Sequence, residues 1–469
     1  MNRDRHQETT EITELILEAA AKARAEIGPI GKQPATGKAA KWPIECTIGP
    51  GLEGAIACES KVGYVNGSAG MLSYRGYDIF ELCAYSTYEE VSFLLLHGYL
   101  PSSEELKIFE DKLTNYRHMN KTLRLLMSYP VEEMNAMAAL RMGTIFMRQE
   151  FTILDREEAK PKLDDAISAD EDSIAMETKP SGEKRAIYEF KKKKSKKRKK
   201  SGHDDASGLE ACYHLIAGVP TITAAIARLR HGLMPYEPSN ELSHAANIFY
   251  MMNGRRPTPI EERVLDVALI LHADHGMNAS TFASMVVAST MSDIYFSVGS
   301  GIAALNGPLH GGANERVIHT LRDVGSPGNA EAWVKETLAK KDKVPGFGHR
   351  VYNTYDPRAR ILGPLAKFKC SGCSSEIQNL ITTAERVEHE VVDALSQDKN
   401  VFPNVDYYSG VVYTRLGIDS AMFTPLFAVS RVAGWTARVL EYIQKNRIFR
   451  PRALYTGQFN REFTKIDER

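Results

Sequence analysis

The sequence has few cysteines, six in 469 residues, and most of them are scattered. A small secreted domain depends on a dense framework of disulfides, so this distribution argues against that class and favours a reducing compartment. Only Cys370 and Cys373 lie close together, in the stretch CSGC. A structural zinc site needs two further ligands at a recognisable spacing, and no second pair exists. We therefore expect these two residues to be plain thiols.

The chain also lacks a long apolar run and an excess of charge of either sign. No apolar stretch approaches the length that spans a bilayer, and the residues up to Gly28 lack the apolar core of a secretory signal. Lysine plus arginine and aspartate plus glutamate both number 59, which argues against a generally cationic nucleic-acid protein. We expect a cytoplasmic protein with no membrane partner, and we do not expect nucleic acid as a partner.

What the sequence does contain is mostly helical periodicity. Apolar residues recur at helical spacing, with caps at the start and Gly or Pro after the end, in 259–275, 280–300, 330–341, 374–395 and 424–444. The one convincing β signal is KVGYVNGSAGMLSYRGYDI, where alternating residues flank Asn-Gly and predict a hairpin. The sequence predicts an all-α fold with a small N-terminal β-hairpin.

The segment 152–207 differs from the rest, because an acidic half is followed by the run KKKKSKKRKK at 191–200. Its high charge and few large apolar residues predict a disordered insertion between two core helices. Blocks of like charge bind polyanions, so one interpretation is a binding segment for nucleic acid, an acidic partner or an anionic membrane surface. The other is a solvated loop without a partner, which we favour because no aromatic residues interleave with the lysines to stack bases.

Three Gly-rich loops each present ionisable residues. In LNGPLHGGANERV, His310 precedes a predicted helix whose dipole disfavours imidazolium and keeps a neutral N–H donor. In VPGFGHRVYNTYDPRAR, His349 and Arg358 suit a small ligand with a carbonyl and carboxylates. In FPNVDYYSG, Asp406 stands among aromatic residues that desolvate a carboxylate and raise its basicity. For the first motif alone the plainer interpretation is a turn histidine that caps a helix, and for the third it is an ordinary Asx turn after Pro403.

A fourth stretch, LHADHGMNAST, places His272 and His275 about one helical turn apart with Asp274 between them. Such residues suggest a metal site. However, the HExxH pattern is absent and spacing assigns no third ligand. We expect no metal here.

Taken together and in this order, these stretches resemble the motifs of the citrate synthase family. The resemblance rests on YRGYDI, LHADHGMNAST, GPLHGGAN, GFGHRVY with DPRA, NVDYYSG and RPRALYTG. It implies an all-helical fold with a large and a small domain, working as a homodimer or as a hexamer built from dimers. The domains expected are an N-terminal helix and arm at 1–53, a large domain at 54–311 and 419–469, and a small domain at 312–418.

The resemblance also implies roles for single residues. Asp406 matches the general base that takes a proton from the methyl group of acetyl-CoA. His310 matches the residue that stabilises the enol at the thioester oxygen, and His349 matches the one that polarises the oxaloacetate carbonyl. His275, Arg358 and Arg431 match oxaloacetate-binding positions, and Arg450 matches an arginine supplied by the neighbouring subunit.

The resemblance places coenzyme A against the loop of Val344, Gly346, Gly348 and Asn353. Glycines let backbone approach a ligand closely. Asn353 stands where many relatives carry a basic residue that suits a coenzyme A phosphate. No cofactor is implied beyond the coenzyme A thioester, which is a substrate.

The activity implied is that of a citrate synthase of the tricarboxylic acid cycle, a transferase acting on acetyl-CoA and oxaloacetate. One alternative is a 2-methylcitrate synthase, which uses propionyl-CoA with the same catalytic residues. One methylene is worth only about 1 to 3 kcal/mol in an apolar pocket, so the sequence leaves this choice open. An alternative of another class is a polyanion-binding protein that uses the Lys-rich insertion on an inactive scaffold.

Overall fold

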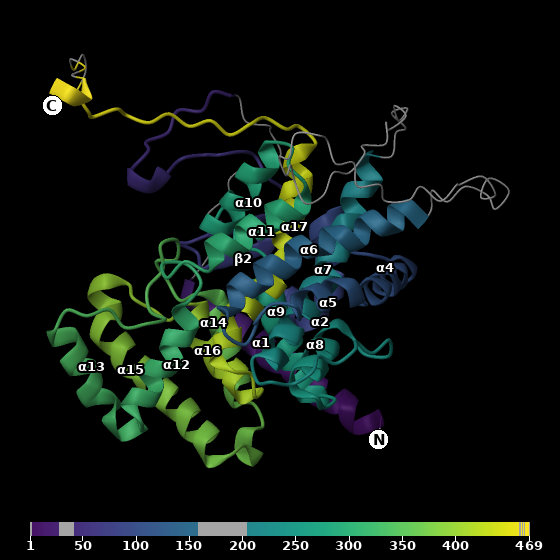
Figure 1. The fold of residues 1–469 in the computed structure, drawn as a ribbon. Helices are drawn as coiled ribbons and strands as arrows, with labels where there is room; N and C mark the ends of the chain where they lie inside the picture. Colours follow the sequence, from purple (N-terminus) through teal and green to yellow (C-terminus); the bar gives the residue numbers. More distant parts are fainter. Residues whose placement is uncertain are drawn as a thin grey trace, which may run out of the picture.

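Figure 1 shows the computed structural model, which describes residues 2–27, 42–157, 204–458, 461, 463 and 465–468. This part of the chain forms seventeen α-helices and one small sheet, so the predicted all-α class is confirmed. The helices are α1 (Asn2–Ile27), α2 (Ile79–Tyr85), α3 (Tyr88–His97), α4 (Ser103–Tyr116), α5 (Asn120–Leu126), α6 (Ala136–Glu157), α7 (Asp204–Leu229), α8 (His244–Asn253), α9 (Pro259–His272), α10 (Ala279–Ser289), α11 (Ile294–Leu305), α12 (Ala313–Val324), α13 (Ala330–Ala339), α14 (Pro357–Lys367), α15 (Ser375–Lys399), α16 (Val405–Arg415) and α17 (Phe423–Ile443).

The sheet confirms the predicted hairpin and adds one strand. Strands β1 (Gly63–Asn66) and β2 (Met71–Tyr74) pair antiparallel around the Asn-Gly turn, and β3 (Tyr77–Asp78) pairs with β2. The Tyr74 side chain is fully buried, and its hydroxyl donates to the Asp274 carbonyl at 2.9 Å. The hairpin is therefore attached to the loop that follows α9.

The helix predicted at 280–300 is in fact two helices, α10 and α11. Met291 between them has a left-handed φ of 65°, which a continuing helix does not permit. Asp293 then caps α11 by accepting a hydrogen bond from the Phe296 backbone N–H at 3.0 Å. The predicted start at Pro259 is confirmed, because Thr258 and Glu261 form a capping box, but α9 ends at His272 rather than at residue 275.

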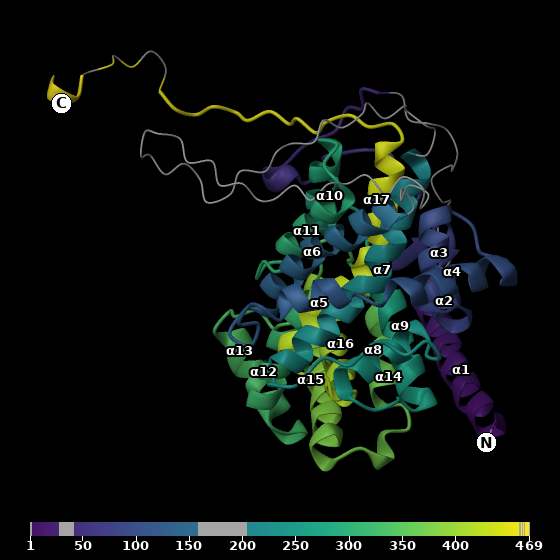
Figure 2. The same ribbon diagram turned by 45° about the vertical axis from the view of Figure 1, so that its right-hand side comes forward.

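The core of the molecule surrounds α17, in which every residue from 423 to 439 is buried. Helices α3, α7, α9, α10 and α11 pack against it. Figures 1 and 2 both show α10 and α11 beside α17. Within α7, the stretch Gly208–Leu229 is long and apolar enough to cross a membrane, so the expectation that no run reaches that length was wrong. Yet 89% of its apolar window is buried inside the protein, which is the position of a core helix.

Helices α12, α13 and α15 form a group to one side of this core, with α14 and α16 between the group and the core (Figures 1 and 2). Helix α16 packs against α12, α14 and α15. The predicted small domain at 312–418 would comprise these five helices, and that division stays a prediction.

Helices α6 and α7 are the two core helices predicted to flank the insertion. They run antiparallel, because Gly143 lies against Ile222 and Gly218 lies against Met147. Their free ends at Glu157 and Asp204 therefore lie at the same end of the pair. The first six residues of the predicted insertion belong to α6 and its last four belong to α7, so the prediction of disorder was wrong for both ends. The rest, including the basic run at 191–200, lies outside the described residues.

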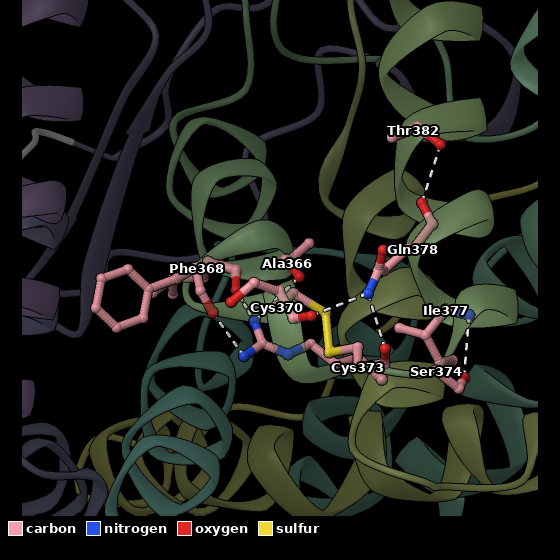
Figure 3. Close-up of a disulfide and its surroundings, with 11 residues drawn as sticks. Ala366, Phe368, Cys370, Cys373, Ser374, Ile377, Gln378 and Thr382 are labelled. Atoms are coloured by element: carbon pink, nitrogen blue, oxygen red, sulfur yellow. Dashed lines mark hydrogen bonds between the residues drawn. A yellow bond between two sulfur atoms is a disulfide. The ribbon is translucent and has the colours of Figure 1, made fainter.

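The expectation of plain thiols at Cys370 and Cys373 was wrong, because the two form a disulfide (Figure 3). Counting ligands excluded zinc but did not exclude a bond between the two sulfurs. A short 3-10 turn, Cys370–Gly372, brings their Cα atoms to 5.0 Å, within the range that a disulfide spans. The other four cysteines are free.

Candidate active site

His310 lies on the turn between α11 and α12, three residues before α12 begins, as the sequence predicted. The Ser280 backbone N–H donates to its Nε2 at 3.2 Å, and the Ser280 hydroxyl is 2.8 Å from the same atom. A backbone N–H only donates, so in the neutral ring Nε2 is the acceptor and Nδ1 carries the proton. Burial, and then the Arg431 charge, lower the pKa of His310 to about 4. The ring is therefore neutral at physiological pH, as the sequence predicted, and burial is the largest cause.

His349 has the opposite tautomer. Its Nδ1 accepts from two backbone N–H groups, of Val351 at 2.9 Å and of Tyr352 at 3.1 Å. The neutral ring therefore carries its proton on Nε2. Burial and the neighbouring Arg358 lower the pKa of His349 to about 4. The structure thus supplies a second neutral N–H donor whose orientation is fixed by backbone.

Asp406 lies in the first turn of α16, where Asn404 caps the helix and accepts from the Asp406 backbone N–H at 3.0 Å. Its Oδ1 is shielded from solvent and has no hydrogen-bond partner among the described residues. Burial raises the pKa of Asp406 to about 6, and the charge of Asp356 adds to this, while Arg358 and Arg431 act against it. Asp406 is therefore a desolvated carboxylate that is more basic than an ordinary one.

Two buried arginines accompany these groups. The Arg358 guanidinium binds Asp356 through Nε and Nη2, at 3.0 and 2.7 Å, which leaves its Nη1 outside this pair. Arg431 donates from Nε to the His272 carbonyl at 2.6 Å. Burial lowers the pKa of Arg431 to about 10, so it remains cationic at neutral pH. Both charges lie close enough to affect the pKa of Asp406.

His275 is buried beside His349, with their ring centroids 5.2 Å apart, and its Nε2 lies 3.2 Å from the Tyr352 hydroxyl. The two other side chains of the suggested metal site, Asp274 and His272, form hydrogen bonds elsewhere. Arg438 binds both carboxylate oxygens of Asp274 at 2.7 Å, and His272 Nδ1 donates to the Ala268 carbonyl at 2.7 Å. These side chains do not converge, and no cluster of three or more metal-ligating side chains occurs in the part of the chain that the structure describes.

The structure thus brings six of the predicted residues into one electrostatically connected site. They come from widely separated segments and are His275, His310, His349, Arg358, Asp406 and Arg431. Among the described residues no ion pair or hydrogen bond joins Arg450 to this site. It is exposed on the segment that extends away from the core after α17 (Figures 1 and 2).

The loop predicted to contact coenzyme A is pinned next to Asp406. The Asn404 backbone N–H donates to the Gly346 carbonyl at 2.8 Å, and its side-chain amide donates to the Gly348 carbonyl at 2.9 Å. Both glycines have a φ of +78°, but a Cβ on Gly346 would meet Tyr407 and Val317 at 2.8 Å, whereas Gly348 faces open space. Val344 is buried. Only Gly348 therefore has room beside its Cα for a ligand.

The remaining residue of that loop, Asn353, donates its backbone N–H to the Gly67 carbonyl at 3.1 Å. Gly67 lies at the turn of the hairpin, and a Cβ there would clash with the Val351 carbonyl. The hairpin turn and the loop of His349 are consequently in close backbone contact.

Sequence reasoning missed three residues that support the site: Ser280, Asp356 and Arg438. Asp356 had a sequence signal, because an Asp followed by Pro is a typical helix start, and it caps α14. Arg438 lies seven residues after Arg431 and so on the same face of α17. Ser280 contacts His310 across thirty residues of sequence, and no local pattern predicts that contact.

Comparisons with known proteins match citrate synthases over most of the chain. The family model described as citrate synthase, C-terminal domain, matches residues 51–452. The chain is 40% identical to the citrate synthase of Haloferax volcanii over 421 residues, which covers 89% of this chain and 98% of that protein. It is 37% identical to citrate synthase 2 of Bacillus subtilis over 426 residues, with coverage of 89% and 98%.

Solved structures give the same result. The citrate synthase of Pyrobaculum aerophilum superposes with a TM-score of 0.73 at 35% identity, covering 93% of this chain and all of that one. The ternary complex of carboxymethyl coenzyme A and oxaloacetate with the citrate synthase of Thermoplasma acidophilum gives a TM-score of 0.74 at 29% identity, covering 91% and 100%.

Proposed function

This chain belongs to the citrate synthase family, and from that premise we propose how its own residues carry out the reaction. It is an acyl-transferring enzyme that forms citrate, and the family implies acetyl-CoA and oxaloacetate as substrates, with no cofactor beyond the coenzyme A thioester. The overall reaction converts acetyl-CoA, oxaloacetate and water into citrate and coenzyme A. The assignment of each step to a residue is our proposal.

Asp406 is the general base, and its environment is the observation that carries the proposal. The α-proton of a thioester is too weakly acidic for a carboxylate in water to remove at a useful rate. A shielded Oδ1 without a partner, in a group whose burial raises the pKa to about 6, is a stronger base that is still mainly ionised at neutral pH. Asp406 takes the methyl proton, and the electron pair moves toward the thioester oxygen.

His310 donates to that oxygen from Nδ1. The bond from the Ser280 backbone N–H to Nε2 fixes this tautomer without any rearrangement during the reaction. A pre-placed donor of this kind is typically worth about 3 to 4 kcal/mol of transition-state stabilisation. The resulting enol carbon is the nucleophile.

His349 acts on the other substrate. Its Nε2–H polarises the carbonyl of oxaloacetate, the enol carbon bonds to the carbonyl carbon, and the proton passes to the new alkoxide. Arg358 binds an oxaloacetate carboxylate through its remaining Nη1, Arg431 binds one through its guanidinium, and His275 is a third oxaloacetate-binding residue. Water then hydrolyses the citryl thioester and releases citrate and coenzyme A.

The assembly and location of the enzyme are also proposals. We propose a homodimer, or a hexamer built from dimers, in the cytoplasm. The support is Arg450, which is exposed on an extended segment and matches an arginine that the family supplies to a neighbouring subunit. Two-fold symmetric pairing would place one Arg450 at each of two sites.

Free-thiol release tests this function. We expect acetyl-CoA to release coenzyme A only when oxaloacetate is present, and Asp406→Ala to abolish the release. Propionyl-CoA in the same assay measures the preference between the citrate and 2-methylcitrate reactions through the ratio of kcat/KM. No oxaloacetate-dependent release from either thioester would contradict the proposed reaction and leave the polyanion-binding alternative standing.

A further inference from the structure

Glu388 on α15 binds two tyrosines that belong to different parts of the active site. Its Oε1 accepts from the Tyr355 hydroxyl, and its Oε2 accepts from the Tyr408 hydroxyl. Both oxygens of one carboxylate are thus occupied by phenols from two segments that are 53 residues apart. Hydrogen bonds from a neutral donor to a carboxylate are shorter and stronger than those between neutral groups.

Tyr355 leads to the residue that binds oxaloacetate in the proposed mechanism. It directly precedes Asp356, which caps α14 and holds Arg358 through two hydrogen bonds. The Arg360 guanidinium lies 4.3 Å from the centre of the Tyr355 ring. The Tyr355 ring therefore anchors the start of α14, and with it the position of Arg358.

Tyr408 leads to the general base. It lies two residues after Asp406 in α16. Next to it, Tyr407 donates from its hydroxyl to the Ala384 carbonyl at 2.7 Å, one turn before Glu388 on α15. Two consecutive tyrosines therefore fasten the first turns of α16 to the same face of α15.

Asp356 closes this set of contacts. Its Oδ2 accepts from the Val405 backbone N–H at 3.2 Å, directly before Asp406. The start of α14 and the start of α16 therefore touch each other, and each is tied to Glu388 through a tyrosine. A shift of Glu388 would change the separation between Arg358 and Asp406.

We propose that Glu388 is a positioning residue that sets the spacing between the oxaloacetate-binding arginine and the general base. This inference rests on the proposed function, since it concerns the geometry of the same reaction. Both carboxylate oxygens of Glu388 are bound by tyrosines. It acts through Tyr355 on one side and through Tyr408 on the other. Displacing a reacting group by about 1 Å costs on the order of 100-fold in rate.

The first test compares Glu388→Ala, Glu388→Gln and the control Glu385→Ala. Glu385 lies on the same helix and pairs with the exposed Lys367 at 2.7 Å, so its loss should leave kcat/KM within about 2-fold of wild type. Glu388→Ala should lower kcat/KM for oxaloacetate by about 10- to 100-fold at a temperature where circular dichroism shows it folded. Glu388→Gln keeps the shape and one acceptor, and should recover most of that loss.

The second test separates the contact through Tyr355 from the contact through Tyr408 by their effects on the kinetics. Tyr355→Phe should mainly raise KM for oxaloacetate, because it loosens Arg358, whereas Tyr408→Phe should mainly lower kcat, because it loosens Asp406. A merely structural role would lower Tm in both variants and leave kcat and KM unchanged. These phenylalanine variants keep the rings, so they decide the question even where Glu388→Ala fails to fold.

The inference and the proposed function fail in different ways. The positioning role would be overturned if wild type shows normal oxaloacetate-dependent thiol release and Glu388→Ala has wild-type kinetics. If Glu388→Ala does not fold, wild-type kinetics in both tyrosine variants would overturn it instead. A wild type without that release would overturn the proposed function. In that event, calorimetric titration with oxaloacetate still tests the effect of Tyr355 on Arg358. Tyr355→Phe should weaken oxaloacetate binding, and an unchanged Kd would contradict the inference.

Discussion

The carboxylate of Asp356 holds the guanidinium of Arg358 in a fully buried two-point contact, at 3.0 Å from Oδ1 to Nε and 2.7 Å from Oδ2 to Nη2. Burial alone would raise the pKa of Asp356, but the charge and hydrogen bonds of Arg358 outweigh it, and the pKa lies below its ordinary value. The pair therefore neutralises most of its own charge while leaving Nη1 of Arg358 for a ligand.

Replacing Asp356 with asparagine should destabilise the fold strongly. The change leaves the Arg358 charge buried without its partner, which typically costs about 3 to 5 kcal/mol. The free energy of unfolding from urea titration measures the effect. Glu385→Gln, which breaks the exposed pair with Lys367, should cost no more than about 1 kcal/mol. Equal losses in the two variants would contradict the importance we assign to the buried pair.

The pH dependence of kcat/KM should report the pKa of Asp406. Since the base acts as a carboxylate and its pKa is raised to about 6, activity should fall about tenfold per pH unit below that value and level off above it. His310 and His349 have pKa values of about 4, so they remain neutral over this range and add no step. A midpoint near the ordinary aspartate pKa would contradict the desolvation of Asp406.

The same raised pKa has a consequence for stability. Folding raises the pKa of Asp406, so the folded protein binds this proton more tightly than the unfolded chain does. Protonated Asp406 therefore stabilises the fold at low pH, and this stabilisation is lost as pH rises through about 6. Asp406→Asn should therefore be inactive and yet unfold at a higher Tm than wild type at neutral pH. An inactive variant with a lower Tm would contradict this sign.

Gly346 and Gly348 offer a matched pair of substitutions. Both have a φ of +78°, so alanine carries a backbone penalty of about 1 to 2 kcal/mol at either position. Gly346→Ala adds a clash with Tyr407 and Val317, and should lower the free energy of unfolding further. Gly348→Ala should cost only the backbone penalty, and should raise KM for acetyl-CoA if the ligand approaches there. The reverse order of stabilities would contradict the packing described.

Thiol titration in denaturant tests the Cys370–Cys373 disulfide. Wild-type protein should show four reactive thiols without a reductant and all six after reduction. The double variant Cys370→Ser, Cys373→Ser should show the same count in both conditions. Six thiols in unreduced wild type would show that the bond is absent in the isolated protein.

Subunit mixing tests the proposed exchange of Arg450. Asp406→Ala and Arg450→Ala should each be inactive or nearly so as pure proteins. If Arg450 enters the neighbour's site, unfolding and refolding the two together should restore about one quarter of wild-type activity, since half of the dimers are mixed and each has one complete site. Arg450 acting within its own subunit would give no such recovery.

The sequence predicted the parts of this site that are marked locally. Glycines flank His310 and His349, Asn404 and two tyrosines mark Asp406, and a Pro with a capping box marks the start of α9. It did not predict the contacts between distant segments. The pairs Ser280 with His310, Asp274 with Arg438 and Glu388 with two tyrosines form only when helices pack, and their spacings carry no periodic signal. The disulfide was missed because two cysteines that are close in sequence can either remain thiols or form a disulfide.

The antiparallel pairing of α6 and α7 also determines how much stability an insertion between these two helices costs. The ends at Glu157 and Asp204 are brought together by the packing of the two helices, whatever joins them. The entropy of closing a loop grows only with the logarithm of its length, so connections of six or of forty residues differ by about 2 kcal/mol. A longer connection at this junction therefore costs the fold little stability, which makes it a suitable place for an engineer to insert a tag.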